Sequence, residues 1–236
     1  MNIHKLAPKN IPVLTNEECD RVRETIMLLR PSWRSRDPWV PFYTLGAASY
    51  LDAVGKAPSY KRLVNEYNPL LKEHFSWLYE RVTGLLGEHL GAPATCAENL
   101  AVPGFHIFIE SNIFELSVAS IHCDSQYRLH DWSGKDADLG NPVSFTLSIA
   151  LPKNGGGLNT WDVSYDEILA RASEKLEDPT CGRELVYHAY RRGHMAVHSG
   201  HMLHQIAPGK DLQPEDERIT LQGHAILADG IWQLYW

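Results

Sequence analysis

The tripeptide His122-Cys123-Asp124 combines the residue types of a metal site at a suitable spacing. It is the only place in the 236-residue sequence where a carboxylate follows a histidine by two positions. In extended backbone the side chains of residues i and i+2 point the same way, so an imidazole nitrogen and a carboxylate oxygen would approach one cation together. With 12 histidines and 29 acidic residues, composition alone yields about one or two such matches, so the tripeptide alone is a weak signal. Its position after a predicted strand favours a metal site.

The third ligand of such a site must come from a distant part of the chain. Near the C-terminal end, five histidines fall within seventeen residues: His188, His194, His198, His201 and His204. A histidine taken at random is more often a satisfied core or surface residue than a ligand, and His198 and His201 compete with His204 for the role. His204 is favoured because Arg218, fourteen positions later, opens an apolar strand. Two histidines and one carboxylate on one face of an iron ion leave three coordination positions open.

The first third of the chain is predicted to be helical. Thr15 and Glu18 have the spacing of a capping box, and the helix that they begin runs to Leu29, before Pro31. A second helical region starts near Ser59. Within it, Asn68-Pro69 is predicted to be an N-cap followed by proline at the first helical position, with Gly91 at the end.

From residue 102 onward the apolar period changes to that of strands. Eight short runs are predicted as strands: Val102–Ile109, Leu116–His122, Val143–Leu151, Leu158–Val163, Glu184–Tyr190, His194–His198, Met202–Ile206 and Arg218–Leu227. One helix, Ser164–Lys175, interrupts them. We therefore expect a mainly β fold with N-terminal helices, a double-stranded β-helix (jelly roll, cupin-like) core flanked by helices. The chain is predicted to be a single domain, 1–236, with a helical buttress over 1–100 and the β core over 101–236.

Two of the predicted strands have one apolar and one polar face. Over 144–151, Phe145, Leu147 and Ile149 alternate with small polar side chains. Over 218–225, the alternation places Arg218, Thr220, Gln222 and His224 on one face. This polar face either meets water, as in any half-exposed sheet, or lines a cavity, and the pattern alone favours neither.

The composition excludes some classes of partner. The formal net charge is −7 and no run of lysine and arginine occurs, which argues against nucleic acid or an anionic membrane. The four cysteines are scattered without C-x-x-C spacing, and the first ten residues lack the apolar core of a secretory signal. No stretch approaches the length of a membrane span. We expect a cytoplasmic protein with free thiols, and the sequence leaves its oligomeric state open.

The set H-x-D, a distant histidine and R-x-T resembles the Fe(II)/2-oxoglutarate-dependent dioxygenase superfamily. The stretch GGGLNTWD is similar to a turn and fourth strand of that family, and GHMAVHSG with HMLHQIAP is similar to its sixth and seventh strands. The resemblance covers roughly residues 102–227. The segments PFYTLGAASYLD and PGFHIF are more weakly similar to stand-alone bacterial hydroxylases that act on free amino acids or comparable metabolites.

The resemblance implies a role for each residue of the set. His122, Asp124 and His204 match the Fe(II) ligands, and Arg218 matches the residue that binds the distal carboxylate of the cosubstrate 2-oxoglutarate. Thr220 faces the same way as Arg218 and is predicted to bind the cosubstrate by donating a hydrogen bond to the same carboxylate. A surface ion pair of the arginine with a neighbouring acidic residue is the alternative, and it would contribute little stability. Candidate substrate contacts are Gln126, Tyr127 and Arg128, although a polar surface loop is an equal alternative. Arg34 and Arg36 are further candidates for binding a substrate carboxylate.

The implied reaction consumes 2-oxoglutarate and O₂ and hydroxylates a small molecule, such as a free amino acid. The carboxylate of Asp124 favours hydroxylation over halogenation, whereas desaturation or cyclisation stays open. Two other readings also stay open: a cupin-like metalloenzyme that does not use 2-oxoglutarate, and a non-catalytic β-barrel whose histidines are structural. The segments 33–43 and 132–141 are candidate lids.

Overall fold

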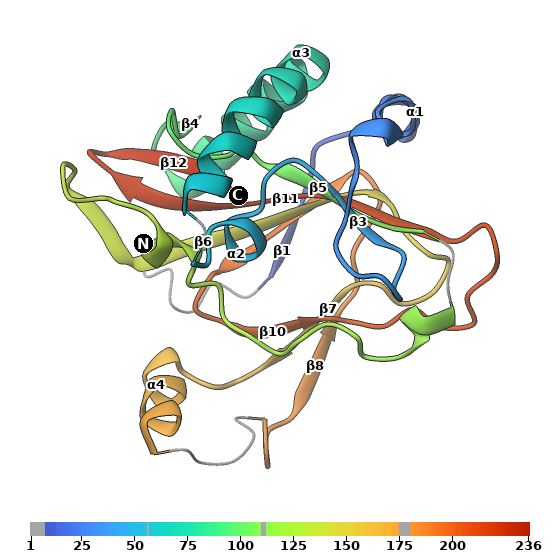
Figure 1. Ribbon diagram of the computed structural model, residues 1–236. Coiled ribbons are helices and arrows are strands. Elements are labelled where there is room, and N and C mark those ends of the chain that lie inside the picture. Colours follow the sequence, from blue (N-terminus) through green and yellow to red (C-terminus); the bar gives the residue numbers. More distant parts are fainter. Residues whose placement is uncertain (1–7, 56, 110–111, 175–179) are drawn as a thin grey trace.

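The computed structural model describes residues 8–55, 57–109, 112–174 and 180–236 (Figure 1). Within these ranges a large sheet has nine strands in the order β1-β9-β6-β11-β5-β3-β2, with β12 beside β11 and β4 beside β12. The bounds are β1 (Lys9–Pro12), β2 (Arg34–Ser35), β3 (Phe42–Leu45), β4 (Ala94–Cys96), β5 (Gly104–Ile109), β6 (Ala137–Ala150), β9 (His194–Ser199), β11 (Glu217–Ala228) and β12 (Ile231–Tyr235). A small sheet has the order β10-β7-β8, formed by β10 (Leu203–Ile206), β7 (Leu158–Trp161) and β8 (Leu185–His188).

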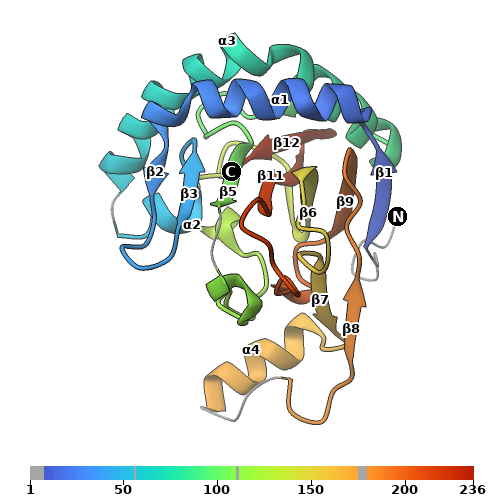
Figure 2. The same ribbon diagram turned by 90° about the vertical axis from the view of Figure 1, so that its right-hand side faces the viewer.

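The helices lie mainly on one side of the large sheet. They are α1 (Asn16–Leu28), α2 (Ser49–Asp52), α3 (Ala57–Leu90) and α4 (Tyr165–Glu174), with 3₁₀ turns η2 (Arg30–Ser32), η3 (Asn112–Glu115) and η4 (Gln126–Leu129). Figure 2 shows α1 and α3 across one face of the large sheet and the small sheet on its opposite side. The predicted fold class is therefore confirmed: two facing sheets, antiparallel except where β4 pairs with β12, form a double-stranded β-helix core flanked by helices.

The helix starting at Thr15 forms as predicted. The Thr15 hydroxyl accepts a hydrogen bond from the Glu18 amide, and the Glu18 carboxylate accepts one from the Thr15 amide, which completes the capping box. Helix α1 ends at Leu28, and η2, which contains Pro31, follows it. The buried side chains of α1 join those of α3 and the large sheet in one apolar core. Among the described residues no helix has both the length and the apolarity to cross a membrane.

The predicted N-cap at Asn68-Pro69 is wrong. Helix α3 continues through Pro69, and its one departure from helical geometry lies at Phe75, where φ is −131° and ψ is 18°. The side-chain amide of Asn68 donates to the Leu100 carbonyl and accepts from the Val102 amide, so it ties the helix to the segment that leads into β5. Upstream of the proline, buried Leu63 and Val64 hold the helix against the core. This packing outweighs the local preference for a helix start.

The predicted strand over 116–122 is also wrong. Leu116 is 64% exposed and Val118 is 45% exposed, so these apolar side chains have no sheet to pack against. Only an isolated bridge forms, between His122 and His204. The strands β1, β2, β3, β4 and β12 were not predicted, and each has five residues or fewer. The helix predicted over 164–175 is observed as α4, and residue 175 lies outside the described residues.

The polar faces of β6 and β11 meet in register. Phe145, Leu147 and Ile149 enter the apolar core under the helices. On the opposite face, Ser144 pairs with His224, Thr146 with Gln222, and Ser148 with Thr220. Members of this polar face line a cavity between the sheets, so the cavity interpretation is confirmed and the water-facing interpretation is wrong.

The close contact between β5 and Trp236 gives a test of the packing. A Cβ atom at Gly104 would overlap the Trp236 ring, so Gly104→Ala is expected to lower the free energy of unfolding by about 1–3 kcal/mol. Gly84→Ala is the matched control, because a Cβ there meets no atom within 4 Å and alanine favours the helix by roughly 0.5–1 kcal/mol. Urea denaturation followed by circular dichroism measures both. Equal stability of the two variants would contradict the packing.

Candidate metal centre

Main-chain hydrogen bonds bring the three predicted ligands together. The amide of His122 donates to the His204 carbonyl and the amide of His204 donates to the His122 carbonyl, each with an N–O distance of 2.9 Å. Two residues further, the Asp124 amide donates to the carbonyl of Gly200 at 2.7 Å. These bonds hold the segment that follows η3 beside the turn between β9 and β10. The side chains of His122, Asp124 and His204 therefore lie close together.

The side chains of His122, Asp124 and His204 converge on one point. Their ligand atoms all lie within 4.8 Å of one another. The Nε2 atom of His122 lies 3.6 Å from one Asp124 oxygen, and the Nε2 atom of His204 lies 3.5 Å from the other. Two imidazole nitrogens and one carboxylate on one side of a cation form the facial arrangement found at non-haem iron sites.

Outer hydrogen bonds orient the three ligands. The Nδ1 atoms of His122 and His204 lie 3.0 Å and 2.8 Å from the carbonyls of Ser120 and Met202. Nδ1 therefore donates to a carbonyl, and Nε2 keeps its lone pair for a metal. The Asp124 carboxylate accepts from the Ser144 hydroxyl at 2.6 Å and from the Gln126 amide at 3.0 Å.

The electrostatics of the cluster favour a charged Asp124 carboxylate beside a neutral His204 imidazole, whereas Asp124 raises the pKa of His122. Burial alone would raise the pKa of Asp124, but the rings of His204, His224 and His122 outweigh burial and hold it well below its usual range. Burial lowers the pKa of His204 to about 4. A neutral imidazole and an ionised carboxylate are the protonation states that bind a divalent cation.

The competing histidines occupy other positions. His198 lines the same cavity, its ring centroid lies 4.9 Å from that of His204, and its Nδ1 lies against the carbonyl of Ser199. The ring of His201 stacks on Tyr165 at 3.9 Å. Neither belongs to the convergent cluster that the described residues form.

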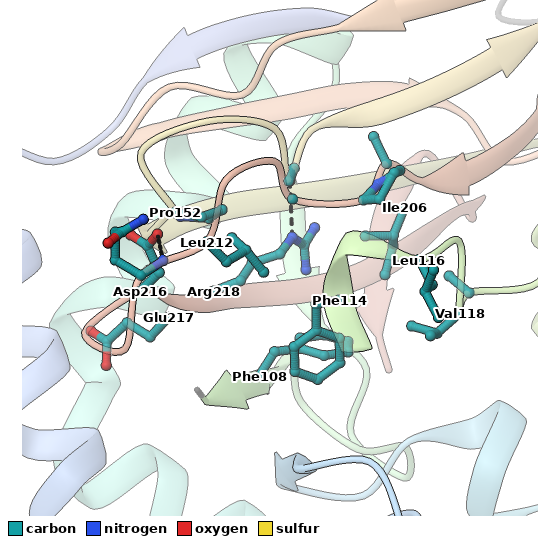
Figure 3. A pocket seen from close by; sticks show the side chains of 16 residues that line it. Phe108, Phe114, Leu116, Val118, Pro152, Ile206, Leu212, Asp216, Glu217 and Arg218 are labelled. Carbon is teal, nitrogen blue, oxygen red and sulfur yellow. Dashed lines mark hydrogen bonds between the residues drawn. The ribbon is translucent and has the colours of Figure 1, made fainter. Parts of the chain in front are cut away.

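Arg218 lines the same cavity and pairs with no carboxylate among the residues that the structure describes. It is 7% exposed, and its Nε atom donates to the Gly156 carbonyl at 2.9 Å. Arg218 also lines a second, smaller pocket, where Figure 3 shows it near Phe108. Nη1 reaches only the Thr220 hydroxyl, at 3.4 Å, and Nη2 has no hydrogen-bond partner among the described residues. The guanidinium also lies 5.7 Å from the centre of the Phe108 ring. The surface ion-pair alternative for Arg218 is wrong.

The cavity between the sheets has a volume of about 620 Å³. Of the three candidate substrate contacts, Gln126 and Arg128 line it, whereas Tyr127 packs into a separate apolar cluster with Trp132.

The two further candidates for binding a substrate carboxylate have other partners. Arg36 forms a two-pronged ion pair with Asp52, at 2.8 Å for each bond, and Arg34 lies 3.4 Å from the same carboxylate. Both arginines therefore have a partner inside the protein. The lid candidate 33–43 contributes Asp37, Val40 and Phe42 to the cavity wall, and no lining residue comes from 132–141.

Two cavity residues, Tyr50 of α2 and His106 of β5, carry no motif and were not predicted as site residues. Both stand in segments that resemble hydroxylases, PFYTLGAASYLD and PGFHIF, but that resemblance assigned them no role. The sequence could have indicated His106 through its alternation with the apolar residues Phe105 and Ile107. This alternation places the histidine on the same side of the sheet as the polar face of β11, next to Thr220.

Comparisons with known proteins support the fold. No protein-family model matches the sequence, and no curated protein matches it. An N-substituted L-amino acid dioxygenase from Burkholderia ambifaria AMMD aligns at 15% identity over 95% of this chain and 77% of its own, with a TM-score of 0.52. SnoK, a non-haem α-ketoglutarate-dependent carbocyclase from nogalamycin biosynthesis, aligns at 14% identity over 97% of this chain and 80% of its own, with a TM-score of 0.52. The epimerase SnoN from the same biosynthesis aligns at 14% identity over 93% of this chain and 77% of its own, with a TM-score of 0.52.

At these identities the likeness concerns the fold. The chain has the fold of the non-haem iron, 2-oxoglutarate-dependent dioxygenases, as the resemblance in its sequence indicated. The His122-Asp124-His204 cluster lies inside that fold, where it could hold a metal ion.

Metal titration tests the cluster directly. Fe(II) added without oxygen to the metal-free protein should bind at one site. His204→Ala and Asp124→Ala should each weaken binding by more than the roughly 10–100-fold that loss of an outer-shell partner costs. His194→Ala is the control, because its Nδ1 contacts the Arg192 carbonyl and it lines no part of the cavity. Unchanged affinity in His204→Ala, measured by calorimetry, would contradict the ligand set.

His130 gives the protein a defined response to acid. Burial lowers its pKa to about 4, and the side chain packs against Tyr60 and Tyr235 beside the Ser49 hydroxyl. The unfolded chain, with a histidine pKa of about 6.5, binds more protons between these values, so stability falls as the pH drops from about 6.5 to about 4. In metal-free protein, His130→Gln should show a smaller loss of unfolding free energy between pH 7 and pH 5. An identical loss in both proteins would contradict this assignment.

Proposed function

We propose that this protein is an Fe(II)- and 2-oxoglutarate-dependent oxygenase that hydroxylates a small molecule. The observation that carries the proposal is a buried guanidinium, that of Arg218, whose Nη2 atom has no hydrogen-bond partner in the described parts of the chain. It lines the same cavity as a cluster of two histidines and one aspartate. A buried cation without a counter-ion is costly, so the site is built for an anion that arrives with the reaction. The residues fit both groups: the cluster fits a divalent iron, and Arg218 fits a carboxylate.

Separate residues would hold the metal and bind the cosubstrate. His122, Asp124 and His204 would hold the metal, and Ser144 and Gln126 keep the Asp124 carboxylate in place. Arg218 would bind the distal carboxylate of 2-oxoglutarate through the planar fork of its guanidinium. Thr220 already accepts from Arg218 Nη1, so its hydroxyl proton is available to the same carboxylate. When bound, iron and 2-oxoglutarate supply the oxidising chemistry that uses O₂ to attack an unreactive C–H bond.

Arg218 also separates this proposal from its first rival. A cupin-like metalloenzyme that does not use 2-oxoglutarate would need the three ligands but no buried, unpaired arginine. The second rival, a non-catalytic β-barrel whose histidines are structural, does not explain why three ligand atoms and a buried guanidinium line one cavity. The four cysteines are free thiols, which supports a reducing, cytoplasmic environment.

The finer proposal concerns the kind of substrate and of oxidation. The cavity volume of about 620 Å³ lies in the range of small-molecule sites. An amino acid or a derivative is the proposed substrate, in line with the amino-acid dioxygenase that shares the fold. Hydroxylation is favoured because Asp124 occupies the position that a halide would need. Cyclisation or desaturation depends on how the substrate is held, and the fold also occurs in enzymes described as a carbocyclase and an epimerase.

The decisive experiment is an anaerobic titration of the metal-free protein with Fe(II) and then 2-oxoglutarate. A visible metal-to-ligand charge-transfer band should appear only when both are present. Arg218→Met removes the bidentate, charge-assisted hydrogen bonds, so its dissociation constant for 2-oxoglutarate should rise by at least about 100-fold.

The control is Arg183→Met, which removes an arginine that pairs with Glu167 outside the cavity and should leave the titration unchanged. A folded wild-type protein that develops no band would overturn the proposal. A band of equal strength in Arg218→Met would remove the arginine from it. Succinate release across a panel of amino acids and their derivatives then tests the substrate class.

A further inference from the structure

A hydrogen-bonded pair outside the metal cluster, Tyr50 and His106, forms part of the wall of the same cavity. Tyr50 belongs to α2 and His106 to β5, and the hydroxyl of Tyr50 lies 2.7 Å from Nε2 of His106. In the large sheet His106 stands directly beside Thr220 on one side and beside Thr44 on the other. The pair therefore faces the same space as the proposed cosubstrate site, one strand further along the sheet.

The surroundings of His106 keep its ring neutral. The side chain is buried, with the ring of Phe42 edge-on at 5.1 Å and that of Trp236 at 5.3 Å. Burial holds the pKa of His106 well below its usual range, and the nearby charges of Arg218 and Arg36 act in the same direction. The imidazole consequently has one proton to share between its two nitrogens.

The position of that proton follows from the Nδ1 atom. Nδ1 is buried and has no hydrogen-bond partner among the described residues. Orphaned N–H groups are rarer in protein interiors than acceptors with an unused lone pair, so the proton belongs on Nε2. Nε2 then donates to the Tyr50 oxygen. Burial raises the pKa of Tyr50, so its hydroxyl keeps its own proton and has that proton free to donate into the cavity.

The mouth of the cavity beside this pair is apolar and open to solvent. Val54 is 59% exposed and Leu129 is 42% exposed, and both line the cavity together with Val40 and Phe42. Apolar side chains that gather exposed around a cavity mouth indicate a surface that a ligand covers. Arg128, at the same mouth, has no carboxylate partner among the described residues and lies over the rings of Tyr127 and Tyr165.

We propose that Tyr50, held by His106, donates a hydrogen bond to an acceptor oxygen of the substrate, whose apolar body lies against Phe42, Val54 and Leu129. This inference rests on the proposed function, because it places the substrate in the cavity of the metal cluster. It narrows the substrate to a molecule that combines a carbonyl-type oxygen with an apolar group. A small hydrophilic amino acid has too little apolar surface to cover the mouth. In this scheme Tyr50 contacts the substrate, and His106 is the residue that positions Tyr50.

Three probes separate the two parts of the proposal. N-acetyl-L-phenylalanine has both an amide carbonyl acceptor and an apolar ring. 2-Benzylpentanoate keeps the ring, the carboxylate and the net charge but lacks the amide carbonyl, and N-acetyl-L-alanine lacks the ring. Their dissociation constants are measured by calorimetry on protein loaded with Fe(II) and 2-oxoglutarate without oxygen. N-acetyl-L-phenylalanine should bind about 10-fold more tightly than the probe without the acceptor, and at least about 10-fold more tightly than the probe without the ring.

Tyr50→Phe should abolish the preference for the acceptor and keep the preference for the ring. Tyr43→Phe is the matched control, since it removes a hydroxyl from β3 that does not line the cavity, and both preferences should persist. The charge-transfer band with 2-oxoglutarate should be unchanged in both variants, which also shows that they fold. Its absence from the wild type would instead indicate failure of the proposed function.

Three results would overturn the inference. The first is equal binding of the acceptor and non-acceptor probes to the wild type, and the second is no binding of any probe. The third is weaker 2-oxoglutarate binding in Tyr50→Phe, which would place the hydroxyl in the cosubstrate site.

A second experiment measures which nitrogen of the His106 imidazole carries the proton. In protein carrying diamagnetic Zn(II), nitrogen NMR of His106 should show the proton on Nε2. A proton on Nδ1 would also overturn the inference.

Discussion

The two reciprocal main-chain hydrogen bonds between His122 and His204 are the constraint on which the site depends. They join an irregular segment, which has no sheet of its own, to β10 in the small sheet. Backbone bonds do not depend on the identity of side chains, so they hold the main chains of the two histidines side by side, and the Nδ1 bonds then orient the rings. Asp124 follows because its own amide is tied to the neighbouring turn at Gly200. Ligands from distant parts of the chain thereby form one cluster with little freedom of position.

The large sheet contributes the second requirement, a polar wall inside a buried space. Its inner face matches polar residue to polar residue across β6 and β11, while the outer face packs apolar side chains against α1 and α3. Arg218 stands buried on the inner face, where it forms no ion pair among the described residues. The same burial that makes an unpaired guanidinium costly makes it a strong binder for an arriving anion.

Much of this could be predicted from local patterns. The capping box at Thr15, the alternation in β6 and β11, and the H-x-D spacing each depend on residues close together in the chain. The continuation of α3 through Pro69 could not be predicted, because it depends on core contacts made by residues upstream of the proline. The Tyr50–His106 pair was missed for a similar reason: only the folding of α2 over β5 brings the two residues together.

The separation of ligand segments from mouth segments has an evolutionary consequence. The cluster is held by residues 120–124 and 200–204, whereas the opening is lined by Val40, Val54 and Leu129, which come from other stretches of chain. Replacements around the opening would leave the main-chain bonds of the cluster intact. A lineage with this architecture can therefore acquire new preferences among substrates by drift at a few rim positions, without passing through ancestors that have lost the ability to bind iron.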